Sequence, residues 1–430
     1  MSSTKGKPGW LALAVLIVAL VGGSYAMGRK DIDPLAMLRR VIAPADSTAV
    51  ATALFQRCGA IGGPAETKCY GAALDSLATG GQVRVAMRAL ARLAVLDPDA
   101  GREGHTFAHS IGMAAGRGGG DISAMFSQCD ESNQSGCYHG VLQSYLVAAK
   151  TIGPTEVNAT CQSFKGPKAD RWLLFQCVHG TGHGLTMYYG HDMPRALKDC
   201  DYMNEDWDRR SCYAGVFMEN IVNAQTPKDM SHDDGHGGRM AGMAPPSKWK
   251  ALDKKDLLYP CSIMEDKYLP ACYEMQTAAI LFQNGGNIKS AAGTCDTAPK
   301  AMRIVCYQSL GRDISAFALQ NHARAIEMCA LGTLKYQPWC YFGLVKSFVN
   351  MNARAEDGVA FCKELKGGPS KMKCYEAVGE QIGTLRNETA ERSALCQGSE
   401  PEYREACLFG ARVTIVPPPA LDQINKSATE

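Results

Sequence analysis

Hydrophobic positions near the start of the chain form one uninterrupted run, which predicts a membrane-directed segment. The run extends from Trp10 to about Val21, and the uncharged stretch from Pro8 to Gly28 is just long enough to span a bilayer. Ser24 and Ala26 occupy the small-residue positions of a signal-peptide cleavage site, but two basic residues follow directly. We favour an uncleaved signal anchor over a cleaved signal peptide, and both interpretations place the rest of the chain outside the cytoplasm.

The remaining chain alternates between short helical segments and polar loops, and no substantial segment shows the alternation of apolar and polar residues that is typical of a β-strand. A first helix ends at or near a cysteine, as in 195–200 and 324–329. A polar loop follows, and a second helix starts at the next cysteine, which is usually followed by tyrosine. A small residue often lies three positions beyond that cysteine, which would let neighbouring helices approach closely. The pattern predicts an all-α protein built from helical hairpins.

The 18 cysteines form nine consecutive pairs with separations of 8 to 16 residues. This spacing is too long for CxxC zinc knuckles and too regular for scattered thiols. Nine local disulfides are typical of an oxidising compartment such as a periplasm or an extracellular space. The predicted bridges are Cys58–Cys69, Cys129–Cys137, Cys161–Cys177, Cys200–Cys212, Cys261–Cys272, Cys295–Cys306, Cys329–Cys340, Cys362–Cys374 and Cys396–Cys407.

The cysteine pairs also reveal an internal repeat. The first cysteines of the last five pairs follow one another at steps of 34, 34, 33 and 34 residues. This is the length of a tetratricopeptide unit, which the hairpins resemble in length only. A gap of two periods after Cys58 predicts one unit without cysteines near residues 82–118. We therefore expect a right-handed α-solenoid of about ten units, nine of them with an internal disulfide.

Composition and charge limit the function classes. Lys+Arg 45 against Asp+Glu 43 leaves a net charge of +2, so we expect no nucleic-acid partner. Motifs for covalent haem, for common nucleotide folds and for a serine nucleophile are missing. The expected organisation is a tail (1–9), a signal anchor (10–28), a linker (29–45), N-terminal repeats (46–223), an insertion (224–254), C-terminal repeats (255–414) and a polar tail (415–430).

Five of the nine histidines occupy two equivalent helix positions in three consecutive units. These positions lie two and six residues beyond the cysteine that starts the second helix, or beyond Glu103 in the unit without cysteines. Residues four apart share a helix face, and equivalent positions of stacked units line one surface. The two positions are occupied by His105 and His109, by His139 and Gln143, and by His179 and His183.

The histidine cluster predicts a site for a transition-metal ion on units two to four. A histidine pair at i, i+4 is the spacing that chelates zinc in metalloproteases. Imidazole alone does not choose between Zn, Fe, Cu and Mn. Gly182 and its neighbours would leave backbone room for a bound group, and Glu219 is a candidate carboxylate ligand or general base. The alternatives are a metal-free groove for an anionic or glycan ligand and purely structural hydrogen bonding.

The insertion is rich in Gly, Pro, Met and His, and His232 and His236 within it are candidate lid ligands. Its Met and His together also suggest copper, although a solvated loop is the simpler interpretation. His191 and His322 are expected on the surface. Three functions stay open: a metal-dependent hydrolase or oxidase, a scaffold that binds an envelope protein or peptide, and a copper or zinc handling protein. The sequence does not decide whether the protein is an enzyme.

Overall fold

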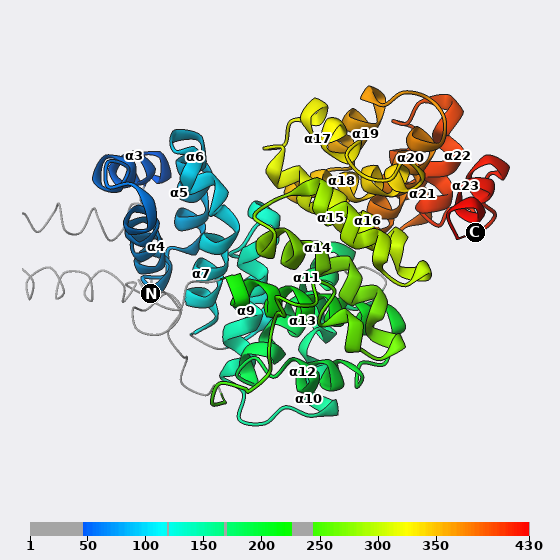
Figure 1. Cartoon of the computed structure of the whole chain (residues 1–430). Coiled ribbons are helices and arrows are strands. Elements are labelled where there is room, and N and C mark those ends of the chain that lie inside the picture. The colour runs from blue at the N-terminus through cyan, green and yellow to red at the C-terminus, as the bar shows by residue number, and fades with distance from the viewer. Residues whose placement is uncertain (1–45, 118–119, 167–169, 226–243, 430) are drawn as a thin grey trace, which may run out of the picture.

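The computed structural model describes residues 46–117, 120–166, 170–225 and 244–429. The expected anchor and linker, together with His232 and His236, lie outside the described residues. Within them the protein is all-α, and its helices pack as sequential pairs from one end of the molecule to the other (Figure 1). No helix of the described ranges is both long enough and apolar enough to cross a bilayer.

Along the chain, first and second helices of these pairs alternate. The first helices are α3 (Ser47–Cys58), α5 (Val83–Leu96), α8 (Ile122–Phe126), α10 (Pro154–Thr160), α12 (Met193–Cys200), α15 (Ile288–Thr297), α17 (His322–Cys329), α19 (Ala355–Glu364) and α21 (Thr389–Cys396), and a short 3-10 turn, η3 (Cys261–Ile263), takes this place in the sixth unit. The second helices are α4 (Gly63–Thr79), α7 (Gly104–Gly116), α9 (Gly136–Val147), α11 (Arg171–Tyr188), α13 (Asp206–Gln225), α14 (Leu269–Gln283), α16 (Arg303–Phe317), α18 (Gln337–Asn352), α20 (Pro369–Leu385) and α22 (Arg404–Gly410). The unit without cysteines is formed by α5 and α7, with the short helix α6 (Pro98–Arg102) between them.

All nine disulfides form between the predicted partners, and the described cysteines include no free thiol. Each bridge ties the end of a first helix to the following second helix. In most units the second cysteine lies inside its helix rather than at the start, although Cys137 is the second residue of α9. In α11, for example, Asp170 accepts hydrogen bonds from the backbone N–H groups of Trp172 and Leu173, well before Cys177.

The tyrosine after the second cysteine explains the recurring Cys-Tyr pair. Its ring is fully buried at Tyr70, Tyr307 and Tyr375, and its hydroxyl donates a hydrogen bond to a carboxylate of the same or the next unit. Tyr375 donates to Glu400 over 2.8 Å, for example. A buried phenol needs such an acceptor, so in these three units the tyrosine anchors the hairpin to a connecting segment.

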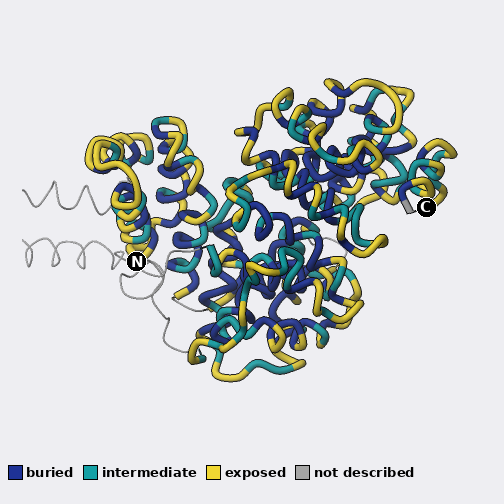
Figure 2. The backbone as a smooth tube through the Cα atoms, viewed as in Figure 1, coloured by how far each residue is buried: buried dark blue, intermediate teal, exposed yellow. Residues whose placement is uncertain are grey.

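The second helices form the core of the molecule, and most first helices lie on its rim (Figure 2). Each second helix packs against the one before and the one after it. Distant units also touch, because α11 contacts α20 and the Nε of Arg171 donates a 2.8 Å hydrogen bond to the carbonyl of Gly383. The segment expected as a polar tail contains helix α23 (Pro419–Thr429), whose Leu421 is fully buried and which packs against α20.

Candidate metal centre

The five histidines predicted to share a register lie in one cluster. They come from three neighbouring second helices, α7, α9 and α11. The ring of His139 is central, with its centroid 5.0 Å from those of His179 and His183 and 5.3 Å from that of His109. His105 completes the group, 4.6 Å from His109 between ring centroids.

Glycines bring these helices together. A Cβ at Gly140 of α9 would lie 2.0 Å from the backbone carbonyl oxygen of His109, so only glycine permits the observed contact between α7 and α9. The predicted small position three residues beyond the second cysteine is thus a point of backbone contact. Gly182 is part of the same packing, since a Cβ there would lie 2.1 Å from the carbonyl oxygen of Cys212. The space expected beside Gly182 for a bound group is therefore filled by helix α13.

His105 and His109 point their Nε2 atoms at each other across 3.1 Å. The Nδ1–H of His105 donates a 2.8 Å hydrogen bond to the carbonyl oxygen of Asn133. The Nδ1–H of His109 donates to Oε1 of Gln143 over 3.2 Å. Since each ring carries its proton on Nδ1 in this network, both Nε2 atoms present a bare lone pair.

Gln143 owes its orientation to Glu219, and this contact decides the tautomer of His109. The Nε2 of Gln143 donates a 2.9 Å hydrogen bond to Oε2 of Glu219, so its Oε1 must face His109. The same Oε2 accepts a 2.8 Å hydrogen bond from Nδ1 of His183. One carboxylate therefore orients two rings, one directly and one through an amide.

The second pair resembles the first. The Nε2 atoms of His179 and His183 lie 3.3 Å apart. His139 differs, because its Nε2 contacts Oε1 of Gln176 at 3.0 Å and so carries the proton. The Nδ1 of His139 is buried and has no hydrogen-bond partner within the structure. Buried polar atoms are almost always satisfied, so this nitrogen calls for a ligand.

The cluster is deepest at α11 and shallower at α7. His183 is fully buried, and His139 and His179 are 4 % and 5 % exposed, whereas His105 and His109 are half-buried. Burial lowers the pKa of His105, and it holds the pKa values of His109, His139 and His179 well below their usual range. Burial therefore favours the neutral form of these rings, which is the form that binds metal ions.

Glu219 is buried within the site and lies behind the rings rather than among them. Burial alone would raise its pKa, but hydrogen bonds from His183 and His191 outweigh burial and hold the pKa below its usual range. The Nε2 of His191 lies 3.5 Å from Oε1 of Glu219, so His191 is part of the site and not the ordinary surface residue expected. Its sequence context signals only a helix end at Gly190 and nothing of its contact with α13. His322, by contrast, contacts Glu364 far from the cluster.

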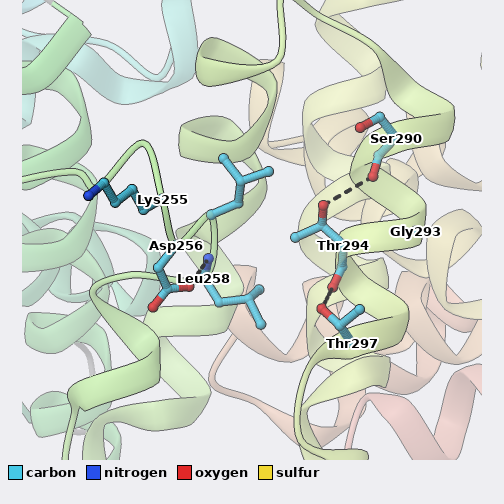
Figure 3. Close-up of a pocket in the computed structure, with 8 residues that line it drawn as sticks. Lys255, Asp256, Leu258, Ser290, Gly293, Thr294 and Thr297 are labelled. Carbon is cyan, nitrogen blue, oxygen red and sulfur yellow. Dashed lines mark hydrogen bonds between the residues drawn. The ribbon is translucent and has the colours of Figure 1, made fainter.

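The described residues contain one acidic group with metal-ligand spacing, formed by Glu66, Asp97 and Asp99. Asp97 is already occupied: Oδ2 accepts from the hydroxyl of Tyr70 and Oδ1 caps helix α6. A surface pocket between the 255–258 loop and α15 is also engaged locally (Figure 3). Its Thr294 hydroxyl donates to the carbonyl of Ser290 in the same helix. We therefore take the histidine cluster, and neither the acidic group nor this pocket, as the candidate functional site.

Comparison of the chain with protein-family models, with curated proteins and with solved structures finds no match. The function therefore rests on the chemistry of the histidine cluster itself.

Proposed function

We propose that this protein binds a transition-metal ion in an oxidising, extracytoplasmic compartment through the five histidines of α7, α9 and α11. One observation carries the proposal: His105 and His109 both use Nδ1–H as a hydrogen-bond donor, and their Nε2 atoms lie 3.1 Å apart. Metal-binding histidines typically donate the outer N–H to an oxygen in this way, which fixes the tautomer and orients the ring.

Electrostatics favours a metal ion between these two nitrogens. Two lone pairs at this separation repel unless a cation lies between them. A proton is a poor candidate because burial disfavours protonation of His109. Two nitrogens bound to one tetrahedral ion at about 2.0–2.1 Å lie about 3.3–3.4 Å apart. The observed Nε2–Nε2 distances of 3.1 Å and 3.3 Å are close to that nitrogen–nitrogen distance.

The donor set narrows the choice of metal. Every candidate ligand atom of the cluster is an imidazole nitrogen, and the nine bridges leave no thiolate among the described cysteines. Imidazole suits Zn, Cu and Fe, whereas Mn prefers carboxylate and water oxygens. We infer that zinc or copper is the natural occupant, with Glu219 as the carboxylate that orients the ligands and offsets the ion's charge, rather than as a general base.

The setting of the site completes the proposal. We infer that the ten hairpins form a right-handed α-solenoid, in line with their 34-residue period and sequential packing. We infer further that residues 10–28 anchor the chain in a membrane, as their uncharged apolar character supports. Nine disulfides would keep such a solenoid folded outside the cytoplasm.

Elemental analysis tests the proposal. The full chain, purified from an oxidising compartment in metal-replete medium, is expected to retain zinc or copper after desalting. A His139→Ala/His179→Ala variant should lose the metal that these two rings hold, whereas His322→Ala, at a histidine outside the cluster, should retain all of its metal. Deletion of 226–246 should leave the metal in place. Folded wild-type protein without metal, capturing an envelope protein instead, would favour the scaffold alternative and overturn the proposal.

A further inference from the structure

We propose that the cluster holds two metal ions, an outer ion bound by His105 and His109 and an inner ion bound by His139, His179 and His183. This inference rests on the proposed function and specifies the number and placement of the ions. Its basis is the way the five ligand nitrogens are distributed in space.

The distances exclude one ion shared by all five rings in this arrangement. The ligand atoms of His105, His109 and His139 lie within 4.8 Å of one another, and so do those of His139, His179 and His183. The described donors form these two triads rather than one group of five. Two nitrogens bound to one ion at about 2.1 Å can be at most about 4.2 Å apart. A single ion would therefore leave one of the close Nε2 pairs without a cation.

Each pair is preorganised for its own ion. His105 and His109 are four residues apart on α7, and His179 and His183 are four apart on α11. The Nε2 separations are 3.1 Å and 3.3 Å. Independent acceptors orient them, since the carbonyl of Asn133 holds His105 and the carboxylate of Glu219 holds His183. His109 is in addition held by Gln143, which itself donates to Glu219.

His139 belongs to both triads but can serve one ion only. Its Nε2 donates to Gln176, so Nδ1 is its single available nitrogen. Its ring centroid lies 5.0 Å from those of both His179 and His183, against 5.3 Å from His109 and 5.9 Å from His105. We assign His139 to the inner ion, which gives a three-plus-two division of the ligands.

The two ions would differ in their access to solvent. The inner ligands are almost completely buried, while His105 and His109 are half-buried. Two protein nitrogens leave a tetrahedral ion with free positions, which water or a small anion would fill at the outer ion. The inner ion is enclosed. Glu219 connects both, directly through His183 and through Gln143 to His109.

A stoichiometric titration decides the matter. Full-length protein stripped with chelator and titrated with Cu²⁺ is expected to bind two ions per chain, whereas His105→Ala/His109→Ala should bind one. His322→Ala should bind two. Binding of a single ion by the wild-type chain would overturn this inference but leave the proposed function standing. Binding of none would overturn both.

A spectroscopic readout needs no variant and so does not depend on variant folding. Two Cu²⁺ ions within one cluster are expected to lie close enough for dipolar coupling, so at two bound ions the paramagnetic resonance spectrum should be broadened and should show a half-field transition. Two uncoupled spins would place the ions apart and contradict a shared centre. In the His105→Ala/His109→Ala variant the signal should integrate to one spin.

Discussion

Gln143 and Glu219 are 76 positions apart in the sequence, yet the amide nitrogen of Gln143 donates a 2.9 Å hydrogen bond to the buried carboxylate of Glu219. The contact links α9 to α13 across α11. It turns the oxygen of Gln143 toward His109 and so selects the tautomer of that ring. A single carboxylate thus influences both histidine pairs.

Replacing Glu219 should weaken metal binding without removing a ligand. In Glu219→Gln the negative charge behind the rings is lost, and an amide nitrogen in the place of Oε1 can no longer accept from His191 while the amide oxygen serves Gln143 and His183. Loss of such a partner typically lowers metal affinity about 10–100-fold. Competition with a metal-binding dye would measure the change. Glu327→Gln, at an exposed position of α17, serves as the matched control, and an equal loss there would contradict the assigned role.

Gln143→Leu should affect the two pairs unequally. The substitution removes the acceptor of His109 but leaves the hydrogen bond between His183 and Glu219 in place. We expect the weaker of two binding steps in calorimetry to fall about 10-fold or more, with the stronger step little changed. Gln308→Leu makes the same change at a half-buried position of α16, outside the cluster. Equal weakening of both steps would argue against separate control of the pairs.

Helix contact at glycine makes Gly140→Ala a severe change. The new Cβ would lie 2.0 Å from the carbonyl oxygen of His109, which forces α7 and α9 apart. We expect destabilisation by about 3 kcal/mol or more, measured by denaturant unfolding, together with loss of metal. Gly293→Ala provides the contrast, because no atom lies within 4 Å of its added Cβ on the exposed side of α15. It should stabilise the protein by about 0.5–1 kcal/mol.

The disulfide Cys129–Cys137 encloses the turn that supplies the carbonyl of Asn133 to His105. Residues 133–135 all have positive φ values, between 52° and 61°, a strained conformation that the surrounding structure must hold. Cys129→Ser/Cys137→Ser should therefore lower metal occupancy as well as stability. The bridge Cys396–Cys407, near the C-terminus, closes a loop of similar length. Replacing both of its cysteines with serine should lower stability by a comparable amount, about 3 kcal/mol, but leave the metal content unchanged. Equal metal loss in both would mean that only global stability matters.

Much of this architecture is local and could therefore be predicted. Disulfides between residues 8 to 16 apart depend on a single hairpin, so the spacing of the cysteines predicted every bridge. Register is equally local, and equivalent helix positions brought His105 and His109 onto the same stripe as His139, His179 and His183. The small residues after the second cysteine indicated close helix packing, which is observed at Gly140.

The partners of these rings were not predictable in the same way. His191 reaches Glu219 through a turn whose direction depends on the packing of α11 against α13. Asn133 presents its carbonyl because three consecutive residues adopt left-handed angles that their side chains do not signal. Helix α23 forms in a segment that is polar by composition, because Leu421 finds a place against α20.

The sequence by itself determined the helical hairpins, their sulfur bridges and the histidine stripe, since each follows from spacing along a few turns of chain. Only the tertiary structure decided which nitrogen each ring turns inward and which acceptor holds each ring. Hydrogen bonds between units determine both, and the geometry of these bonds depends on how closely whole helices approach one another.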